Sequence, residues 1–210
     1  MREQPYDRGR LYGREFAHAP VRTVAPANPP VTLSEAKAHC RVDHADEDAL
    51  LTSLVAAAVA HLDGWSGVLG RAIVTQTWRQ DFDGFGGVGD LRLRLPMPAA
   101  TVVSVVYVDS EGDSQTLDPA AYVLRADVLG SYIEPAYGEA WPTTRNQTGA
   151  VRVTFTAGAA VADVPQPIKQ AILLLVGHWY ANREAVTAGA QVVLPLAVDA
   201  LLASQTYRTL

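Results

Sequence analysis

The stretch PIKQAILLLVGHWYANREAV, residues 167–186, predicts a helix that is apolar on two sides. Pro167 suits the first helical position, where its missing N–H removes no hydrogen bond. One apolar stripe holds Ile168, Ile172, Leu175 and Trp179, and the other holds Leu173, Val176 and Tyr180. A helix with two apolar stripes needs a second surface to cover it. We therefore expect the first stripe to lie in the core of its own subunit and the second to contact a neighbouring subunit.

Arg183, at the polar end of this helix, extends the predicted subunit interface of Leu173, Val176 and Tyr180. A guanidinium group suits paired contacts with carboxylates, so Arg183 can meet an acidic residue across the subunit boundary. It can equally lie in solvent, because a cation is favourable at the carboxyl end of any helix. The sequence leaves both interpretations of Arg183 open.

Two further helices are predicted in residues 31–70. The first follows TLSE, residues 32–35, a capping box in which Thr32 and Glu35 satisfy each other's backbone N–H groups. The acidic turn DHADED, residues 43–48, favours the positive N-terminus of the second helix. Apolar residues then recur at helical spacing, at Leu50, Leu51, Leu54, Val55, Ala58, Leu62 and Trp65. Glycines at 64 and 67 end this helix.

Residues 71–158 change from helical to strand period. AIVTQTWRQDF, residues 72–82, alternates, and LRLRL, residues 91–95, places Leu91, Leu93 and Leu95 on one face. TVVSVVYVD, residues 101–109, and VRVTFTAG, residues 151–158, are strands by their β-branched content. DSEGDS, residues 109–114, predicts a hairpin turn. These strands indicate a small antiparallel β-domain.

The predicted fold class is α+β: a helical frame of two N-terminal helices and a long C-terminal helix, with an inserted small antiparallel β-domain. The division is an extended N-terminal arm (1–30), the first half of the helical part (31–70), the β-domain (71–158), the second half of the helical part (159–203) and a C-terminal tail (204–210). The arm is rich in Arg, Pro and Ala and has no apolar period, which predicts disorder when it is alone. If it is ordered, a partner subunit is the simplest candidate to hold it in place.

Composition excludes several classes of protein. A formal net charge of -5 argues against a general nucleic-acid binder, which usually has a basic face. With one cysteine, Cys40, no intrachain disulfide can form, so nothing requires an oxidising compartment. The start of the chain lacks the apolar core of a signal peptide, and the longest apolar runs fall short of the ~20 residues of a spanning helix. We expect a soluble protein without a membrane partner, cytoplasmic or built into a particle assembled there.

The sequence contains several stretches that partly match catalytic, cofactor-binding or metal-binding motifs, but each lacks the neighbouring structure or spacing that its function requires. GFGGVG, residues 84–89, matches the dinucleotide pattern, but a strand follows it where the pyrophosphate would need a helix. DHADED and DSEGD are acidic without the spacing of a calcium loop. His178 stands alone in an apolar helix, and Ser66 lacks the sharp turn that exposes a nucleophile. We therefore expect no enzyme, and no catalytic, cofactor-binding or metal-binding residues.

The order of segments resembles that of the head–tail connector, or adaptor, proteins of tailed phages, prophages and gene-transfer particles. The resemblance lies in VTLSEAKAHCRVDHADEDALLTSLVAAAVAHLDGWSG, AIVTQTW, YIEPAYGEAWP, VRVTFTAG and the helix at 167–186, and it covers residues 31–203. It implies a non-enzymatic ring, expected to hold twelve copies, beneath the portal protein. The ring would extend the DNA channel and dock the next tail component, a stopper or tail terminator. An acidic chain fits such a channel, because strong phosphate binding would hinder sliding DNA.

The resemblance also implies a portal contact at the C-terminus, since related connectors engage the portal through that region. The residues expected there are Leu201, Leu202, Tyr207, Arg208 and Leu210. LPLAVDALLA, residues 194–203, predicts a short apolar helix that is marginal without a partner. The alternative is that this helix folds back on its own subunit and the last residues fray.

Two other classes of function remain open from sequence. A small ligand-binding or glycan-binding module would show several aromatic residues on one exposed β-face, and Trp78 and Tyr107 are the candidates. An uncharacterised hydrolase would join His178 and nearby acids in one cleft.

Overall fold

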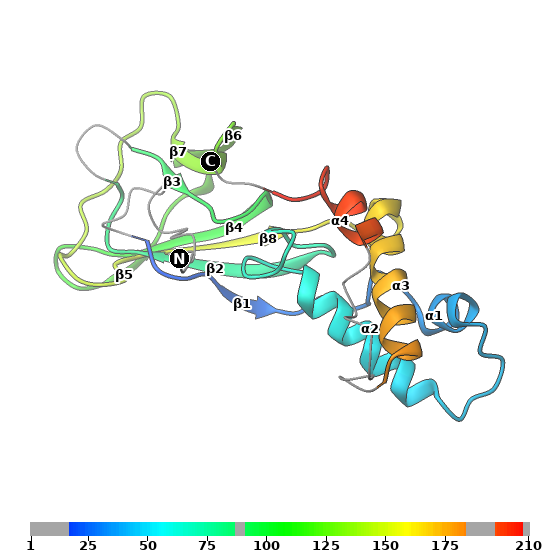
Figure 1. Cartoon of the computed structure of the whole chain (residues 1–210). Coiled ribbons are helices and arrows are strands. Elements are labelled where there is room, and N and C mark those ends of the chain that lie inside the picture. Colours follow the sequence, from blue (N-terminus) through cyan, green and yellow to red (C-terminus); the bar gives the residue numbers. More distant parts are fainter. Residues whose placement is uncertain (1–16, 87–90, 184–195, 208–210) are drawn as a thin grey trace, which may run out of the picture. The chain divides into compact units, whose positions relative to one another are not determined.

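The computed structural model describes residues 17–86, 91–183 and 196–207, which divide into two units (Figure 1). The helical unit comprises the described residues of 26–75 and 158–207, and the β unit those of 17–25 and 76–157. The chain therefore passes between the units after residues 25, 75 and 157. The presence of helices together with antiparallel sheets confirms the predicted α+β class.

Four α-helices build the helical unit: α1 (Leu33–Cys40), α2 (Asp48–Leu62), α3 (Gln166–Ala181) and α4 (Leu196–Leu202). The predicted capping box starts α1, because the Thr32 hydroxyl accepts the Glu35 N–H and the Glu35 carboxylate accepts the Thr32 N–H at 2.7 Å. Arg41 ends α1 in the left-handed conformation, with φ of 58°. A short 3-10 helix, Val161–Asp163, precedes α3.

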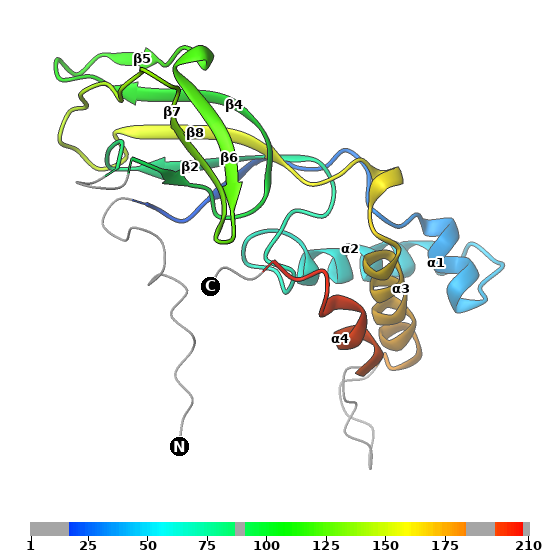
Figure 2. The same cartoon turned by 90° about the horizontal axis from the view of Figure 1, so that it is seen from above.

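Helix α3 lies at the centre of the helical unit and packs against α1, α2 and α4 (Figure 2). Its predicted inner stripe is buried at Ile168, Ile172 and Leu175, whereas the fourth member, Trp179, is only partly buried. These side chains meet the buried face of α2, which consists of Leu51, Val55, Ala58 and Leu62. The small side chain of Ala58 on this face of α2 favours close packing of the two helices. Within the described residues, no helix combines the length and apolarity that a membrane crossing requires.

Two antiparallel sheets build the β unit. The five-stranded sheet has the order β1 (Val21–Val24), β2 (Gln76–Phe82), β8 (Val151–Ala157), β4 (Ala99–Val108) and β5 (Ser114–Thr116). The three-stranded sheet has the order β3 (Leu93–Arg94), β7 (Gly130–Pro135) and β6 (Tyr122–Asp127), and a 3-10 helix, Pro119–Ala121, precedes β6. β4 and β5 are joined through residues 109–113, as the hairpin prediction requires.

Alternation along β2 and β8 decides which face of the five-stranded sheet is buried. Trp78 pairs with Phe155 and Gln80 with Val153, and all four side chains are buried. The opposite face carries Arg79, Asp81 and Arg152 together with threonines, and Asp81 lies 3.1 Å from Arg79 and 3.5 Å from Arg152. The period of two in AIVTQTWRQDF thus separates a buried face, which holds Trp78 and Phe82 with two glutamines, from a charged and partly exposed face.

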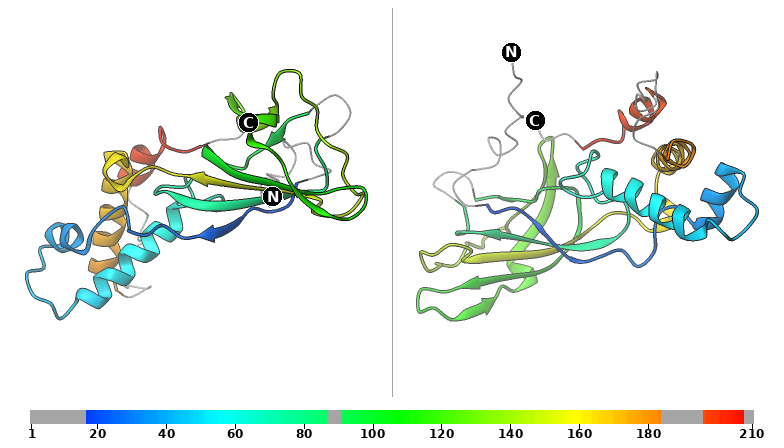
Figure 3. Two further views of the ribbon diagram at one scale, coloured as in Figure 1. Left: turned by 180° about the vertical axis from the view of Figure 1, so that it is seen from behind. Right: turned by 60° about the horizontal axis from the view of Figure 1, so that its bottom comes forward.

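The structure differs from the sequence predictions at two places in the β unit. The N-terminal arm was expected to need a partner subunit, yet Val21–Val24 forms β1 and pairs with β2 of the same chain (Figure 3). Leu91 was expected to share a face with Leu93 and Leu95. It is instead 56% exposed, whereas the other two are buried, because the strand begins only at Leu93.

Candidate interaction surfaces

The carboxyl end of α3 is joined to the start of α2 by three side chains. The Tyr180 hydroxyl donates to Glu47 Oε2, and Arg183 Nη2 donates to Glu47 Oε1. The Arg183 guanidinium carbon also lies 4.8 Å from the centroid of the Tyr180 ring. The hydrogen bonds from Tyr180 and Arg183 lower the pKa of Glu47, and the Glu47 carboxylate raises the pKa of Tyr180 and of Arg183. Arg183 therefore meets its acidic partner inside its own chain.

Not all of the predicted subunit interface lies on the surface. Val176 is fully buried in the core of the helical unit, so its side chain is not available to a neighbour. The reason is that α3 has three helical neighbours, and its buried face is therefore wider than one stripe. Leu173 and Tyr180 are half-buried, and Arg183 remains 52% exposed in its side chain. These three form the part of the predicted interface that a neighbour can reach.

The C-terminal residues lie on their own helical unit as far as residue 207. Leu202, predicted to contact the portal, is 3% exposed and belongs to the core with Val198, because α4 packs on α3. The Tyr207 N–H donates to the Leu69 carbonyl at 2.8 Å. Leu201 and Tyr207 are half-buried. The other two predicted portal residues, Arg208 and Leu210, lie outside the described residues.

The loop between β4 and β5 is organised by one carboxylate. Asp109 Oδ1 accepts the N–H groups of Glu111, Gly112 and Asp113 at 3.1, 3.0 and 2.9 Å, and its Oδ2 accepts from Gln115 Nε2 at 2.8 Å. The Gln115 amide and these N–H groups lower the pKa of Asp109. The carboxylate of Asp109 therefore holds this loop in a defined turn. In the part of the chain that is described, no three His, Cys, Asp or Glu side chains are placed to hold a metal ion.

The turn between β6 and β7 presents an apolar residue that the sequence analysis did not single out. Val128 is 85% exposed at its tip. Behind it, Asp127 accepts the Leu129 N–H at 2.8 Å and pairs with Arg94 at 2.9 Å. The hydrogen bond from Arg94 lowers the pKa of Asp127 to about 2. Arg94 in turn lies 5.4 Å from the ring centroid of Tyr132, so the base of this turn is firmly held.

A second exposed side chain is Tyr137, which stands free on the loop after β7. The loop is anchored by Trp141, whose ring stacks on Phe85 at 4.7 Å and whose Nε1 donates to the Leu91 carbonyl at 2.6 Å. Aromatic side chains at protein surfaces are enriched in interfaces. The motif YIEPAYGEAWP contains three aromatic residues, but only the structure shows which of them is exposed and therefore available to a partner.

The aromatic residues considered for ligand binding do not form an exposed platform. Trp78 is 8% exposed on the inner face of the five-stranded sheet. Tyr107 is half-buried, with its ring edge-on to Phe85 at 5.5 Å between ring centroids. Phe85, within the glycine-rich GFGGVG stretch, is itself buried, so the described part of that stretch contributes to the core of the β unit.

Comparison with known proteins relates these surfaces to an assembly. Residues 30–77 match the model of the family described as phage gp6-like head–tail connector protein. The chain is also similar to chains in solved structures of gene transfer agent particles. One is the neck of an empty particle computed with C6 symmetry, and another is the virion of the native particle; each shares 27% identity, a TM-score of 0.71, and coverage of 92% of this chain and 98% of that chain. The neck of the native particle computed with C12 symmetry matches with the same identity and coverage and a TM-score of 0.67. No curated protein matches the chain.

Proposed function

We propose, from the premise that this chain is a protein of the phage head–tail connector family, that its copies form a ring beneath the portal of a phage-like particle. The observation that carries the proposal is the extent of the likeness. Because 92% of this chain and 98% of a neck chain are covered, both the helical unit and the β unit have counterparts in an assembled neck. The role is structural, and neither a glycan-binding module nor a hydrolase draws support from the similar proteins.

The proposed ring holds twelve copies, extends the DNA channel of the portal and docks the next tail component, a stopper or tail terminator. The C12 symmetry of one similar neck supports this number. The net charge of -5 supports a channel in which DNA is not held by its phosphates. We place assembly in the bacterial cytoplasm and the finished ring at the head–tail junction of the particle.

Size measurement on the purified chain, alone and mixed with portal, tests the proposal. Each copy has a mass of 22.5 kDa, so twelve copies give about 270 kDa by light scattering coupled to size exclusion. With portal present, we expect a complex about 270 kDa heavier than portal alone, and ring-shaped particles by electron microscopy. A chain that stays at the monomer mass under both conditions, and that is absent from purified particles, would exclude the connector role.

Leu173, Tyr180 and Arg183 remain our proposed contact with the neighbouring subunit, with the buried Val176 left out. The contact uses the exposed side of an element that the Glu47 hydrogen bonds already hold in place. An Arg183→Glu variant should lower the fraction of chain in rings, because it reverses the charge at the boundary. Arg125→Glu is the matched control: Arg125 is also an exposed arginine paired with a carboxylate, at 2.5 Å from Glu134. Equal ring yields from both variants would place the contact elsewhere.

For the portal contact we propose Leu201, Tyr207, Arg208 and Leu210, and we omit Leu202 because it is buried. Two truncations separate docking from folding. Deleting residues 208–210 keeps the Tyr207 N–H bonded to Leu69, whereas deleting 204–210 removes that bond as well. We expect both truncated chains to stay folded by circular dichroism and to fail in a pull-down with portal, so that tailless heads accumulate. Full portal binding by both would refute the assignment.

A further inference from the structure

Residues 17–24 form a strap along the edge of the β unit. Ala17 bridges to Phe82, the His18 N–H donates to the Asp81 carbonyl at 2.9 Å, and β1 continues the pairing with β2. Val21 is opposite Arg79, and Val24 is opposite Thr77 after a shift in register. The strap therefore supplies the partner that the edge of β2 needs, since β2 is paired with β8 on its other side.

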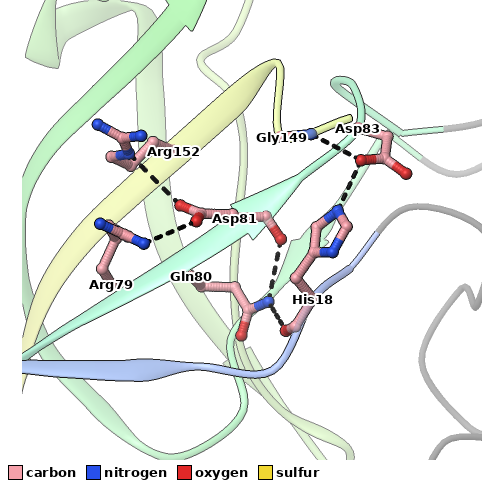
Figure 4. Close-up of polar contacts among 7 residues, drawn as sticks. All are labelled: His18, Arg79, Gln80, Asp81, Asp83, Gly149 and Arg152. Atoms are coloured by element: carbon pink, nitrogen blue, oxygen red, sulfur yellow. Dashed lines mark hydrogen bonds and ion pairs between the residues drawn. The ribbon is translucent and has the colours of Figure 1, made fainter. Parts of the chain in front are cut away.

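Two side chains of the β unit, those of Gln80 and Asp83, hold the strap at His18 (Figure 4). The His18 imidazole lies 2.6 Å from Asp83 Oδ1, which also accepts the Gly149 N–H at 2.7 Å. The Gln80 side-chain amide donates to the His18 carbonyl. Gln80 is only 2% exposed, so an amide on the buried face of the sheet is committed to binding this strap. We call this binding site for the strap the seat. It is built by Gln80 of β2, by Asp83 just after β2, and by Gly149 in the loop before β8.

The strap buries almost none of its own side chains against the β unit. Every residue from 17 to 24 except Pro20 is exposed, and the two valines, Val21 and Val24, are 47% and 56% exposed. Its attachment therefore depends on hydrogen bonds, which water can replace, and hardly on apolar contact. A segment with few buried apolar contacts opens locally far more often than the core unfolds. The β unit therefore binds the strap at defined positions, but the interaction with the strap of the same chain is weak.

The segment that follows the strap is long and extended enough for the strap to contact a neighbouring subunit. Residues 25–29, APANP, lie between the strap and the buried Pro30 of the helical unit, and they contain Pro26 and Pro29. A proline-rich segment is extended and semi-rigid, at about 3.1 Å per residue, so this one spans about 16 Å. It can therefore carry a released strap away from its own β unit to a subunit beside it.

We propose that in the assembled ring each subunit places residues 17–24 on β2 of the neighbouring copy, in the seat that its own strap fills in the free chain. The inference rests on the proposed ring. Exchange between identical chains remakes every contact of the closed form, so it loses none of them. In a ring, each subunit can place its strap on one neighbour and accept the strap of the other neighbour. The ring also keeps the straps at a high effective concentration near their binding sites. The strap thereby links successive copies around the ring.

Disulfide trapping in assembled rings tests the exchange. In a Cys40→Ser background, we introduce Val21→Cys and Arg79→Cys at paired positions of β1 and β2. The matched control is Thr77→Cys with Thr156→Cys, a pair of β2 and β8 that always lies within one chain. Rings isolated from particles are oxidised and separated on a denaturing gel without reductant. We expect a ladder of covalent multimers from the first pair and a 22.5 kDa band from the control.

The outcomes separate the exchange from the ring itself. Rings that form normally but yield only the monomer band from the Val21–Arg79 pair would overturn the exchange and leave the proposed function standing. Failure of the parent chain to form rings would count against the proposed function instead. If the first pair prevents assembly, Val24→Cys with Thr77→Cys probes the same strands. Co-assembly of chains with a single cysteine, one at 21 and one at 79, must then give disulfide-linked dimers.

Discussion

Replacing Gly177 with alanine measures how tightly α1 and α3 are packed. A glycine inside a helix is less favourable than alanine by about 1 kcal/mol, because it loses more backbone freedom on folding. The added Cβ would lie 3.0 Å from Nε2 and 3.1 Å from Cδ2 of His39, on α1. These atoms belong to an exposed side chain, so the imidazole can turn aside by the few tenths of an ångström required. We expect a net stabilisation of roughly 0.5–1 kcal/mol.

Urea unfolding followed by helical circular dichroism measures this change, since all four described α-helices belong to one unit. The control is Gly177→Ala in a His39→Ala background, where the crowding atoms are absent and the full gain of about 1 kcal/mol should appear. The difference between the two backgrounds is the energy of moving the imidazole. Destabilisation by Gly177→Ala in both backgrounds would refute the reasoning, because it would mean that backbone spacing, and not His39, limits the site.

Three further predictions concern the cap, the core and the acid response. Thr32→Ala should destabilise the helical unit by about 1 kcal/mol, measured by urea unfolding, because the Glu35 N–H loses its acceptor. Leu175→Ala should cost about 2–5 kcal/mol in the same assay, since the side chain is fully buried. The folded-state pKa of Asp127, about 2, lies below its ordinary value of 3.8, so its stabilising effect is present above about pH 4 and is lost as the pH falls towards 2. Asp127→Asn should therefore flatten the dependence of Tm on pH between 4 and 2, and an unchanged slope would contradict the role of Arg94.

Local signals in the sequence predicted the helices and most strands well. The capping box at Thr32 and the stripe at Ile168, Ile172 and Leu175 depend on residues close together in the chain, and both are present in the structure. Alternation likewise identified the buried side of β2. Such patterns report which face of an element avoids water, which is why the fold class followed from them.

Features that depend on distant residues could not be read in this way. Glu47 bonds to Tyr180 and Arg183, which lie 133 and 136 positions away, so the cluster is visible only once α2 and α3 are packed. β1 escaped prediction because its residues are all exposed and therefore show no apolar alternation. Its only signal was that three of the four residues in VRTV are β-branched, in a segment that lies between Pro20 and Pro26. Val176 was assigned to the wrong surface because the width of the buried face of α3 depends on how many helices surround it.

The division of the helical unit between residues 26–75 and 158–207 bears on the order in which the chain folds. During synthesis from the N-terminus, the described residues of the β unit are all made before α3 begins at Gln166. Helix α2 by then still lacks α3, its main cover for Leu51, Val55 and Leu62. Closing a contact over so long a loop is slow relative to local pairing. The β unit can thus mature before the helical unit. The apolar side of α2 stays uncovered until α3 has been synthesised, and during that interval it most needs protection from other nascent chains.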